Sequence, residues 1–311
     1  MTAHDRLRHL LTLDGLGGAR IAALLDAAER LRPHALGGSA LRHVLAGRSV
    51  CNLFFENSTR TRTSFQLAAL RLGADVVNFD VGASSVKKGE SALDTLRTLE
   101  AMGLEAFVIR HADNGAVAAL AAGAGPRTAL LNAGDGRSAH PTQGLLDMLT
   151  IRQRKGGDFS RLSVLIVGDV RHSRVARSDL HALHQLGCRD IRVCAPETLL
   201  PEPATVAGCR VGSTLDAMLD GVDVVMMLRL QRERMDEGLV PSLEQYFRDY
   251  GLDARRLARA RPDAIVLHPG PMNRGVEIAG DVADGPQSVI LDQVANGVAV
   301  RMAVLEHLLA D

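Results

Sequence analysis

Short runs of apolar residues alternate along the chain with segments whose apolar residues recur at helical spacing. The apolar runs form two series of candidate strands, residues 49–55, 74–79, 105–110 and 128–133, and then residues 162–169, 190–196, 223–228 and 264–269. Helical patterns separate the first series, at residues 62–72, 90–102 and 114–122. Strands separated by helices predict parallel sheets that are covered on both faces. We therefore expect an α/β protein with two doubly wound parallel-sheet domains.

One helical pattern lies between the two series and joins the domains that they predict. It covers residues 140–154, and Gly156 and Gly157 follow it directly. We expect a first domain over residues 1–143, a second over residues 144–288, and a C-terminal helix in residues 289–311 that packs back on the first domain. Two domains agree with a length of 311 residues, since domains have about 150 residues each.

The composition is that of an ordinary globular enzyme, and it argues against nucleic acid and membranes as partners. Lys and Arg number 36 together, as do Asp and Glu, so no bulk positive field favours nucleic acid. No apolar run is long enough to span a membrane, and the charged first residues do not form a signal peptide. Cys51, Cys188, Cys194 and Cys209 form no CxxC pair and lie in mostly apolar surroundings, which favours buried thiols in a reducing compartment. We expect a cytoplasmic protein without a nucleic-acid or membrane partner.

A turn rich in hydroxyl groups and arginines follows the first predicted strand. The turn and the start of the next helix contain Ser58, Thr59, Arg60, Thr61, Arg62 and Thr63. A helix N-terminus carries unpaired N–H groups and a partial positive charge, so it binds phosphate readily, and an arginine adds a bidentate donor. A helix cap would explain one hydroxyl but neither the others nor the two arginines. The turn is therefore predicted to bind a phosphate or a carboxylate.

Basic and amide side chains follow other predicted strands in the same way. They are Arg110 and His111, then His140 and Gln143, then Arg171, Arg174 and Arg177, and finally Arg229, Gln231, Arg232 and Arg234. Taken alone, His140 is typical of a structural histidine, Arg110 of an ion-pair partner, and the RLQRER segment of a solvated helix face. The carboxyl ends of parallel strands form the binding edge of a sheet. Arginines gathered there in a chain of zero net charge predict a ligand with several negative groups.

Two further patterns bear on the chemistry. The loop SSVKKGES, residues 84–91, is either a surface turn with two solvated lysines or a mobile segment that folds over an anionic ligand. The chain has no G-x-G-x-x-G, P-loop or G-x-S-x-G motif, and its histidines lack partners at metal-ligand spacing. We expect no cofactor and no metal, so that the chemistry depends on positioning and electrostatic stabilisation.

Together these motifs resemble the catalytic chains of aspartate carbamoyltransferases, within the aspartate/ornithine carbamoyltransferase superfamily. The chain contains, in the family's order over residues 51–305, the motifs FFENSTRTRTSFQ, SVKKGES, VIRH, NAGDGRSAHPTQGLLD, VGDVRHSRVARS, RLQRER, LHPGPMNRGVEI and QVANGVAVRMAVL. STRTR and HPTQ mark carbamoyltransferases in general, whereas RLQRER and LHPGPMNRGVEI point to the aspartate member. The resemblance implies a transferase of pyrimidine biosynthesis, which converts carbamoyl phosphate and L-aspartate to N-carbamoyl-L-aspartate and phosphate.

The resemblance also implies roles around carbamoyl phosphate. The groups that hold its phosphate are expected to be Ser58, Thr59, Arg60 and Thr61, with Arg62 in a structural ion pair. Thr61, Arg110 and His140 are expected around the carbamoyl oxygen, which gains negative charge in the transition state. Gln143 is expected near the carbamoyl amide, together with backbone carbonyls near Gly270.

Further roles concern the acceptor and the assembly. Arg174, Arg229 and Gln231 match the clamp for the two aspartate carboxylates. Pro271 stands where the family has a cis proline. Ser84 and Lys88 match residues that enter the site from a neighbouring subunit, which implies a homotrimer with shared active sites. The catalytic residues that the resemblance implies are Arg60, Thr61, Lys88, Arg110, His140 and Gln143.

Two alternatives accompany this interpretation. An ornithine carbamoyltransferase must bind a cationic side chain and carries an HCLP motif, whereas this chain has HPGP and an arginine at position 229. An inactive scaffold homologue would have lost part of the site, yet the turn, the lysine loop and the arginine clamp are all present. Some relatives associate with a regulatory chain and others with a dihydroorotase, and no motif in this sequence decides between these partners. Gly270 departs from the family, which often has a bulky residue there.

Overall fold

The structure is a computed structural model that describes residues 7–39, 41–79, 89–231 and 242–310. The chain forms two compact units. Unit 1 contains Met1–Leu16, Arg20–Leu146 and Ala295–Asp311, and unit 2 contains Gly17–Ala19 and Asp147–Val294. The chain passes between the units within helices α5 (Pro141–Lys155) and α11 (Ile290–Leu309). The end of the chain thus belongs to unit 1, as predicted for the C-terminal helix.

Unit 1 is built on a four-stranded parallel sheet in the order β2-β1-β3-β4. Its strands are β1 (Ser49–Phe54), β2 (Asp75–Phe79), β3 (Ala106–His111) and β4 (Ala129–Asp135). Strands β1, β3 and β4 are almost wholly buried, whereas β2 at the edge is largely exposed. Each of the four candidate strands of the first series is therefore present.

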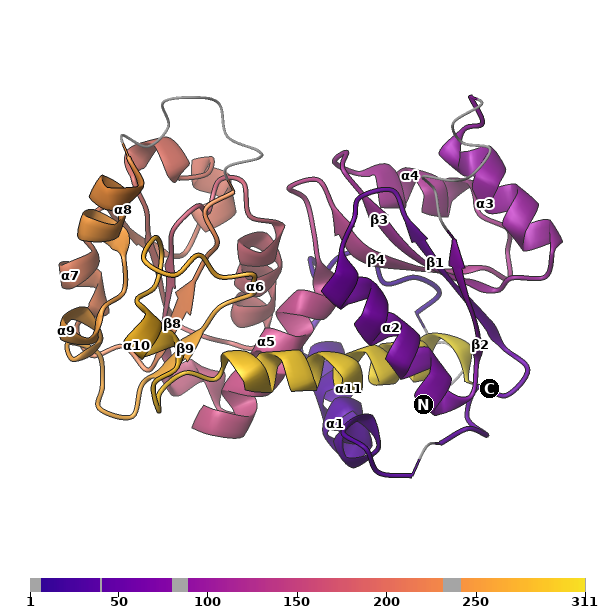
Figure 1. Ribbon diagram of the computed structural model, residues 1–311, viewed down its shortest axis with the longest axis horizontal. Coiled ribbons are helices and arrows are strands. Elements are labelled where there is room, and N and C mark those ends of the chain that lie inside the picture. Colours follow the sequence, from indigo (N-terminus) through magenta and orange to yellow (C-terminus); the bar gives the residue numbers. More distant parts are fainter. Residues whose placement is uncertain (1–6, 40, 80–88, 232–241, 311) are drawn as a thin grey trace. The chain divides into compact units, whose positions relative to one another are not determined.

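Helices cover both faces of this sheet (Figure 1). Alternate residues of β1 and β3 pack in one apolar cluster with α3 (Ala92–Ala101) and α4 (Ala116–Gly123). On the other side, α2 (Thr59–Leu72) contacts β1 and β2. The C-terminal half of α11 lies along α2, where the guanidinium carbon of Arg301 lies 5.0 Å from the centre of the Phe65 ring. Most of α1 (Gly18–Ala35) also belongs to unit 1.

Unit 2 is built on a five-stranded parallel sheet in the order β7-β6-β5-β8-β9. Its strands are β5 (Ser163–Val167), β6 (Asp190–Cys194), β7 (Arg210–Gly212), β8 (Val224–Met227) and β9 (Ile265–Leu267). The helices are α6 (Arg174–Gln185), α7 (Leu215–Leu219), α8 (Leu243–Tyr250), α9 (Ala254–Leu257) and α10 (Gly280–Ala283). Together with unit 1, this confirms the predicted α/β fold of two covered parallel sheets.

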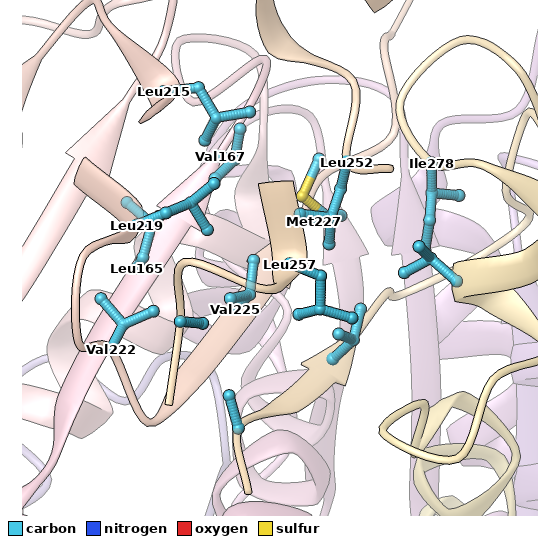
Figure 2. Packing of buried hydrophobic residues seen from close by; sticks show 14 of the residues in the cluster. Leu165, Val167, Leu215, Leu219, Val222, Val225, Met227, Leu252, Leu257 and Ile278 are labelled. Atoms are coloured by element: carbon cyan, nitrogen blue, oxygen red, sulfur yellow. The ribbon is translucent and has the colours of Figure 1, made fainter. Parts of the chain in front are cut away.

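The central strands of unit 2 lack polar alternation because both of their faces are buried. Figure 2 shows Leu165 and Val167 of β5 and Val225 and Met227 of β8 among side chains from α7 and α9. Helices on both sides of a parallel sheet bury both sets of alternating side chains. The same cluster includes Leu252 and Ile278, which come from the segments before α9 and after β9.

Strand β7 is not predicted by the hydrophobic pattern of the sequence. It has only three residues, Arg210–Gly212, and all of them are exposed or half-buried at the edge of the sheet. A short exposed strand has no apolar run, so hydrophobic periodicity cannot reveal it. Its pairing with β6 supplies the regular structure that its own side chains do not encode.

The cysteines are free thiols, as their surroundings in the sequence predict. Cys51, Cys188 and Cys194 are buried, and Cys209 is half-buried. Burial raises the pKa of Cys51 and Cys194 to about 12 and the pKa of Cys188 and Cys209 to about 11. These thiols are therefore protonated at neutral pH, which makes them poor nucleophiles.

Glycine is required at the end of α2. Gly73 is the C-cap residue with φ +90°, and its N–H donates to the carbonyl oxygens of Ala69 and Leu70. A Cβ atom at this position would lie 1.9 Å from the carbonyl oxygen of Arg42. Gly103, which follows α3, has a similar φ of +92° but has no atom within 4 Å of such a Cβ.

We predict that Gly73→Ala destabilises the chain much more than Gly103→Ala. Both substitutions place alanine at a positive φ, which costs about 1–2 kcal/mol, but only the first also forces a contact with backbone. Gly73→Ala should therefore lower the free energy of unfolding by about 1–3 kcal/mol more than the control, Gly103→Ala, does. Urea unfolding of the two variants and the wild type measures this difference, and equal losses would contradict the close approach.

Candidate active site

The residues predicted to bind ligand fall into two groups, one in each unit. The first half-site is Ser58, Thr59, Arg60, Thr61, Arg110, His140 and Gln143 in unit 1. The second half-site is Arg174, Arg229, Gln231, Gly270 and Pro271 in unit 2. Ser84, Lys88, Arg232 and Arg234 lie outside the described residues. In both units the half-site residues lie at or beyond the carboxyl ends of parallel strands.

The hydroxyl-rich turn of the first half-site leads directly into α2. Ser58 occupies the N-cap position with an extended backbone, φ −158° and ψ 100°, but its side chain makes no capping hydrogen bond. Ser58 Oγ instead donates to Thr61 Oγ1 at 3.0 Å. Thr59 and Arg60 are exposed and Thr61 is buried. The cap interpretation is thus wrong for Ser58, and the arrangement remains compatible with an anion at this helix N-terminus.

Arg110 lies at the carboxyl end of β3, between the ends of two other strands. Its Nη2 lies 2.9 Å from Glu56 Oε1, and its Nη1 donates to the carbonyl oxygen of Ala133 at 3.3 Å. The Arg110 carbonyl accepts the N–H groups of Phe55 and Glu56. Glu56 and Arg110 therefore tie the segment after β1 to β3. The ion-pair interpretation of Arg110 is correct for this structure, and it does not conflict with ligand binding, because a guanidinium has five donors.

A carboxylate that the sequence analysis did not single out shapes the turn before His140. Asp135 Oδ1 accepts from Asn132 Nδ2 at 2.9 Å and from the N–H of Ala139 at 3.1 Å, and Asp135 Oδ2 accepts from the N–H of Gly115 at 2.9 Å. Asn132 Oδ1 accepts the N–H of Gly134. The NAGDG stretch contains residue types that form such turns, so a signal was present in the sequence.

His140 and Gln143 are placed by this turn and by the start of α5. His140 directly precedes α5, and its carbonyl oxygen accepts the N–H groups of Gln143 and Gly144. Both side chains are buried. In unit 1 the structure thus brings Arg110, His140 and Gln143 to neighbouring strand ends, since β3 pairs directly with β4.

Asp169 joins two segments of the second half-site. It follows β5 and is fully buried. Its Oδ1 lies 2.8 Å from Nδ1 of His172 and accepts the His172 N–H at 3.2 Å, while its Oδ2 accepts the N–H of Gln231 at 3.3 Å. Burial raises the pKa of Asp169, and His172 opposes this shift. The carboxylate therefore holds the segment before Arg174 and the segment that contains Gln231.

Arg174 and Arg229 extend from two neighbouring strands of unit 2. Arg174 begins α6, after the N-cap Ser173, whose Oγ accepts the N–H of Ala176 at 3.1 Å. Arg229 follows β8, which pairs with β5. Arg174 is buried and Arg229 is half-buried. The carboxyl ends of adjacent parallel strands lie on one edge, so the structure places both arginines at the same edge of this sheet.

Gly270 and Pro271 lie in the loop after β9. The peptide bond between them is cis, as predicted for Pro271. Gly270 donates its N–H to His268 Nδ1 at 2.8 Å. The ion pair predicted for Arg62 is not found among the residues that the structure describes, where Arg62 is exposed.

A pair of buried carboxyl groups lies beneath the second half-site. Asp147 of α5 and Asp179 of α6 are both buried. Burial raises the pKa of Asp179 well above its usual value, and the facing Asp147 raises it further. Two carboxyl groups in one dry site cannot both ionise at ordinary pH. The raised pKa therefore favours the protonated form of Asp179.

In the described ranges no group of three or more His, Cys, Asp or Glu side chains could hold a metal ion. Over the same ranges, none of the helices combines the length and hydropathy that a membrane span would need.

Two models of one family match nearly the whole chain. Residues 8–153 match the aspartate/ornithine carbamoyltransferase carbamoyl-P binding domain, and residues 160–308 match the Asp/Orn binding domain of the same family.

Curated relatives are similar over almost their full length. The aspartate carbamoyltransferase catalytic subunit of Stenotrophomonas maltophilia (strain R551-3) is 68% identical over 310 residues, covering 99% of this chain and 98% of the relative. The corresponding subunit of Xanthomonas axonopodis pv. citri (strain 306) is 68% identical over 309 residues, with the same coverage.

Solved structures with the same fold include both branches of the family. Aspartate transcarbamoylase from Trypanosoma cruzi, in complex with carbamoyl aspartate and phosphate, superposes with a TM-score of 0.90 at 32% identity, covering 99% of this chain and 98% of that one. Ornithine carbamoyltransferase from Thermus thermophilus superposes with a TM-score of 0.84 at 28% identity, covering 97% and 99%.

We predict that Asp179→Asn removes a pH dependence from the stability of the chain. The folded-state pKa of Asp179 is raised, so its contribution to stability is complete below the unfolded-state pKa and is lost as pH rises through the folded-state pKa. Between these two pKa values the wild type should lose about 1.4 kcal/mol per pH unit relative to Asp179→Asn, because one proton is released on unfolding.

Urea unfolding at a series of pH values measures this difference. Asp263→Asn is the control, because Lys155 lowers the pKa of the exposed Asp263, which gives the opposite sign and an effect confined to acidic pH. Parallel curves for the wild type and Asp179→Asn would mean that Asp179 does not bind the proton.

Proposed function

The chain belongs to the aspartate/ornithine carbamoyltransferase family, and we propose that it transfers the carbamoyl group of carbamoyl phosphate to the α-amine of L-aspartate. The products are N-carbamoyl-L-aspartate and phosphate, and the reaction serves pyrimidine biosynthesis. The carrying observation is the 68% identity, over 99% of the chain, with aspartate carbamoyltransferase catalytic subunits. The aspartate acceptor is further supported by the two arginines at one edge of the sheet of unit 2.

The first half-site binds carbamoyl phosphate in this proposal. The N-terminus of α2, with Ser58, Thr59, Arg60 and Thr61, holds the phosphate through N–H groups, hydroxyls and a guanidinium. Arg110 and His140 act on the carbamoyl oxygen, which becomes an oxyanion when the amine attacks. Donors fixed in advance by Glu56 and by the Asp135 turn stabilise that charge without reorganisation during the reaction.

The second half-site binds the acceptor. Arg174 and Arg229 each pair with one carboxylate of aspartate, and Gln231 adds an amide contact. The neutral α-amine attacks the carbamoyl carbon. A C–N bond forms, the C–O bond to phosphate breaks, and the proton that the amine loses leaves with the phosphate. The carbonyl oxygens near Gly270 and the Gln143 side chain accept and donate hydrogen bonds at the carbamoyl amide and so fix its plane.

The residues in these roles do not act as covalent nucleophiles. Rate enhancement comes from holding two anionic substrates with the amine close to the carbon, and from the charge placed around the oxyanion. The catalytic set is Arg60, Thr61, Lys88, Arg110, His140 and Gln143. Ornithine is the competing acceptor, but its cationic side chain would meet the guanidinium of Arg229 instead of a carboxylate.

The assembly is a homotrimer in which Ser84 and Lys88 of one chain complete the site of the next. Exposed apolar residues in unit 1 support an association between chains. Leu67 and Leu70 on α2 and Val77 on the edge strand β2 are all exposed, and exposed edge strands and apolar patches favour contact with another chain. A cytoplasmic location follows from the pathway, and a regulatory chain or a dihydroorotase would be an additional partner.

We predict that the purified chain forms carbamoyl-aspartate from carbamoyl phosphate and L-aspartate, without added metal or nucleotide, and does so faster than it carbamoylates L-ornithine. Arg229→Ala should raise the aspartate requirement at a cost of about 2–5 kcal/mol in kcat/KM, because one buried carboxylate is left poorly paired. Initial rates with both acceptors measure these effects.

Arg255→Ala is the matched control for that substitution. Arg255 is an exposed arginine of unit 2 whose ion pair with Asp216 spans 3.7 Å, so its removal should leave the kinetics unchanged. Faster carbamoylation of ornithine would reject the aspartate assignment, and unchanged aspartate kinetics in Arg229→Ala would remove that residue from the clamp.

We also predict that two inactive variants restore activity when they are refolded together. Arg60→Ala and Lys88→Ala should each be nearly inactive alone. In a closed trimer with shared sites, every mixed trimer has one site with both residues intact. Random mixing of equal amounts makes about three quarters of the trimers mixed, so roughly a quarter of all sites should be wild type. Steady-state rates after co-refolding should therefore reach about a quarter of normal.

The control is the same mixture without subunit exchange, which should stay inactive. Hybrid trimers that are verified by mass but remain inactive would place Arg60 and Lys88 in the site of one subunit, or make Lys88 a solvated surface lysine.

A further inference from the structure

A buried imidazole–carboxylate pair closes the loop that carries Gly270 and Pro271. His268 follows β9 and Glu277 stands at the other end of the loop, and both side chains are 0% exposed. His268 Nε2 lies 3.1 Å from Glu277 Oε1. The proposed reaction assigns no role to either residue. Their complete burial next to a ligand-binding loop therefore needs an explanation.

The hydrogen bonds determine which nitrogen of His268 carries the proton. Gly270 donates its N–H to His268 Nδ1 at 2.8 Å, so Nδ1 is an acceptor and has no hydrogen. The proton is therefore on Nε2, which donates to Glu277 Oε1. Glu277 Oε1 also accepts the N–H of Asn273 at 2.6 Å. The pair thus draws two backbone N–H groups of the loop toward the protein interior.

The anchored N–H fixes the direction of the preceding carbonyl. The peptide bond between Pro269 and Gly270 is trans, because the only cis bond in the described residues is the next one. In a trans peptide the N–H and C=O groups point in opposite directions. Since the Gly270 N–H points at the buried imidazole, the Pro269 carbonyl points away from it. Pro269 and Gly270 are both half-buried, so this carbonyl lies at the solvent side of the loop.

The backbone of His268 is held independently. Its N–H donates to Gln293 Oε1 at 2.9 Å, and Gln293 Nε2 donates to Asp147 Oδ1 at 2.6 Å. All of these groups belong to unit 2. The backbone that carries the imidazole is therefore fixed. The ring then has one orientation in which both nitrogens make a hydrogen bond.

The geometry points to His268 as a positioning residue that aims the Pro269 carbonyl at an N–H group of the bound substrates. This inference rests on the proposed function, in which the carbamoyl amide and the attacking amine are the N–H groups that need an acceptor. In this inference, His268 Nδ1 orients the peptide group between Pro269 and Gly270 by accepting the Gly270 N–H. Glu277 holds the imidazole ring in place and keeps the proton on Nε2. A carbonyl fixed in this way would select the plane of the carbamoyl group in the transition state.

Two substitutions separate the two bonds of the imidazole. In His268→Asn the amide oxygen can take the place of Nδ1 and accept the Gly270 N–H, whereas the bond to Glu277 is lost. In His268→Gln the amide nitrogen can reach the place of Nε2 and donate to Glu277, whereas the Gly270 N–H loses its acceptor. Each variant removes one buried hydrogen bond, so a merely structural role predicts similar losses in both.

We expect His268→Gln to lower kcat by about tenfold to a hundredfold, with KM for aspartate little changed, because a small misplacement of a positioning group costs about that much. His268→Asn should stay within about threefold of the wild-type kcat. Hydrogen exchange of the Gly270 amide, followed by NMR, should be slow in the wild type and in His268→Asn and fast in His268→Gln. Equal kcat values in the two variants would overturn the inference.

Two further variants complete the test. Gln287→Ala is the control, because Gln287 Nε2 donates to the Ala264 carbonyl at the other end of β9, so its loss should reduce stability without changing kcat. Glu277→Gln keeps an oxygen that accepts from Nε2, so near-normal kcat is expected. If the His268 variants do not fold, a Glu277→Gln variant that loses kcat while the Gly270 amide stays protected would reject orientation as the role.

The exchange measurement also separates this inference from the proposed function. A wild-type chain that does not form carbamoyl-aspartate would reject the function, whatever the exchange results. A wild type that forms it, with Gly270 released in His268→Gln but kcat unchanged, would reject only the role of His268.

Discussion

The strands are parallel in both sheets, so the loops that follow their carboxyl ends lie at one edge of each sheet. These loops carry backbone N–H groups that need hydrogen-bond acceptors outside the strand pairing. Buried or half-buried carboxylates take up these groups. Asp135 does so after β4, Asp169 after β5 and Glu277 after β9. A carboxylate accepts several hydrogen bonds at once, so each of these residues fixes a turn of several residues. The candidate site depends on this arrangement, because its arginines and histidine extend from the turns that the carboxylates hold.

Acidic residues near the strand ends also explain how a chain with balanced charge can gather so many cations there. Glu56 lies beside Arg110, and Asp169 lies beside His172, two residues before Arg174. Such acids offset the repulsion between neighbouring arginines. The proposed reaction uses two anionic substrates, so cations held in fixed positions perform the binding and the stabilisation of the oxyanion together.

The buried Asp147 and Asp179 pair shows a different use of acidic residues. Asp147 accepts a hydrogen bond from Gln293, which in turn accepts the backbone N–H of His268. Asp147, which lies on α5, is thus part of the support for the loop with Gly270 and Pro271. The geometry of this loop depends on side chains from several elements of unit 2, and its own residues account for only part of its shape.

The sequence by itself determined the class of fold and the residue types at the site. Apolar runs separated by helical patterns are enough to predict two parallel sheets, because both faces of such a sheet must be buried. The hydroxyl-rich turn, Arg110, His140, Arg174 and Arg229 could be proposed as site residues because they come after those runs, near the carboxyl ends of the strands. Strand β7 could not be predicted, because three exposed residues carry no periodic signal. The contacts of Asp169 with Gln231 and of Asp147 with Gln293 were decided only by the tertiary structure, since they join residues that are 62 and 146 positions apart. Such distant partners cannot be recognised from the residues around the acid, because only the fold brings them together.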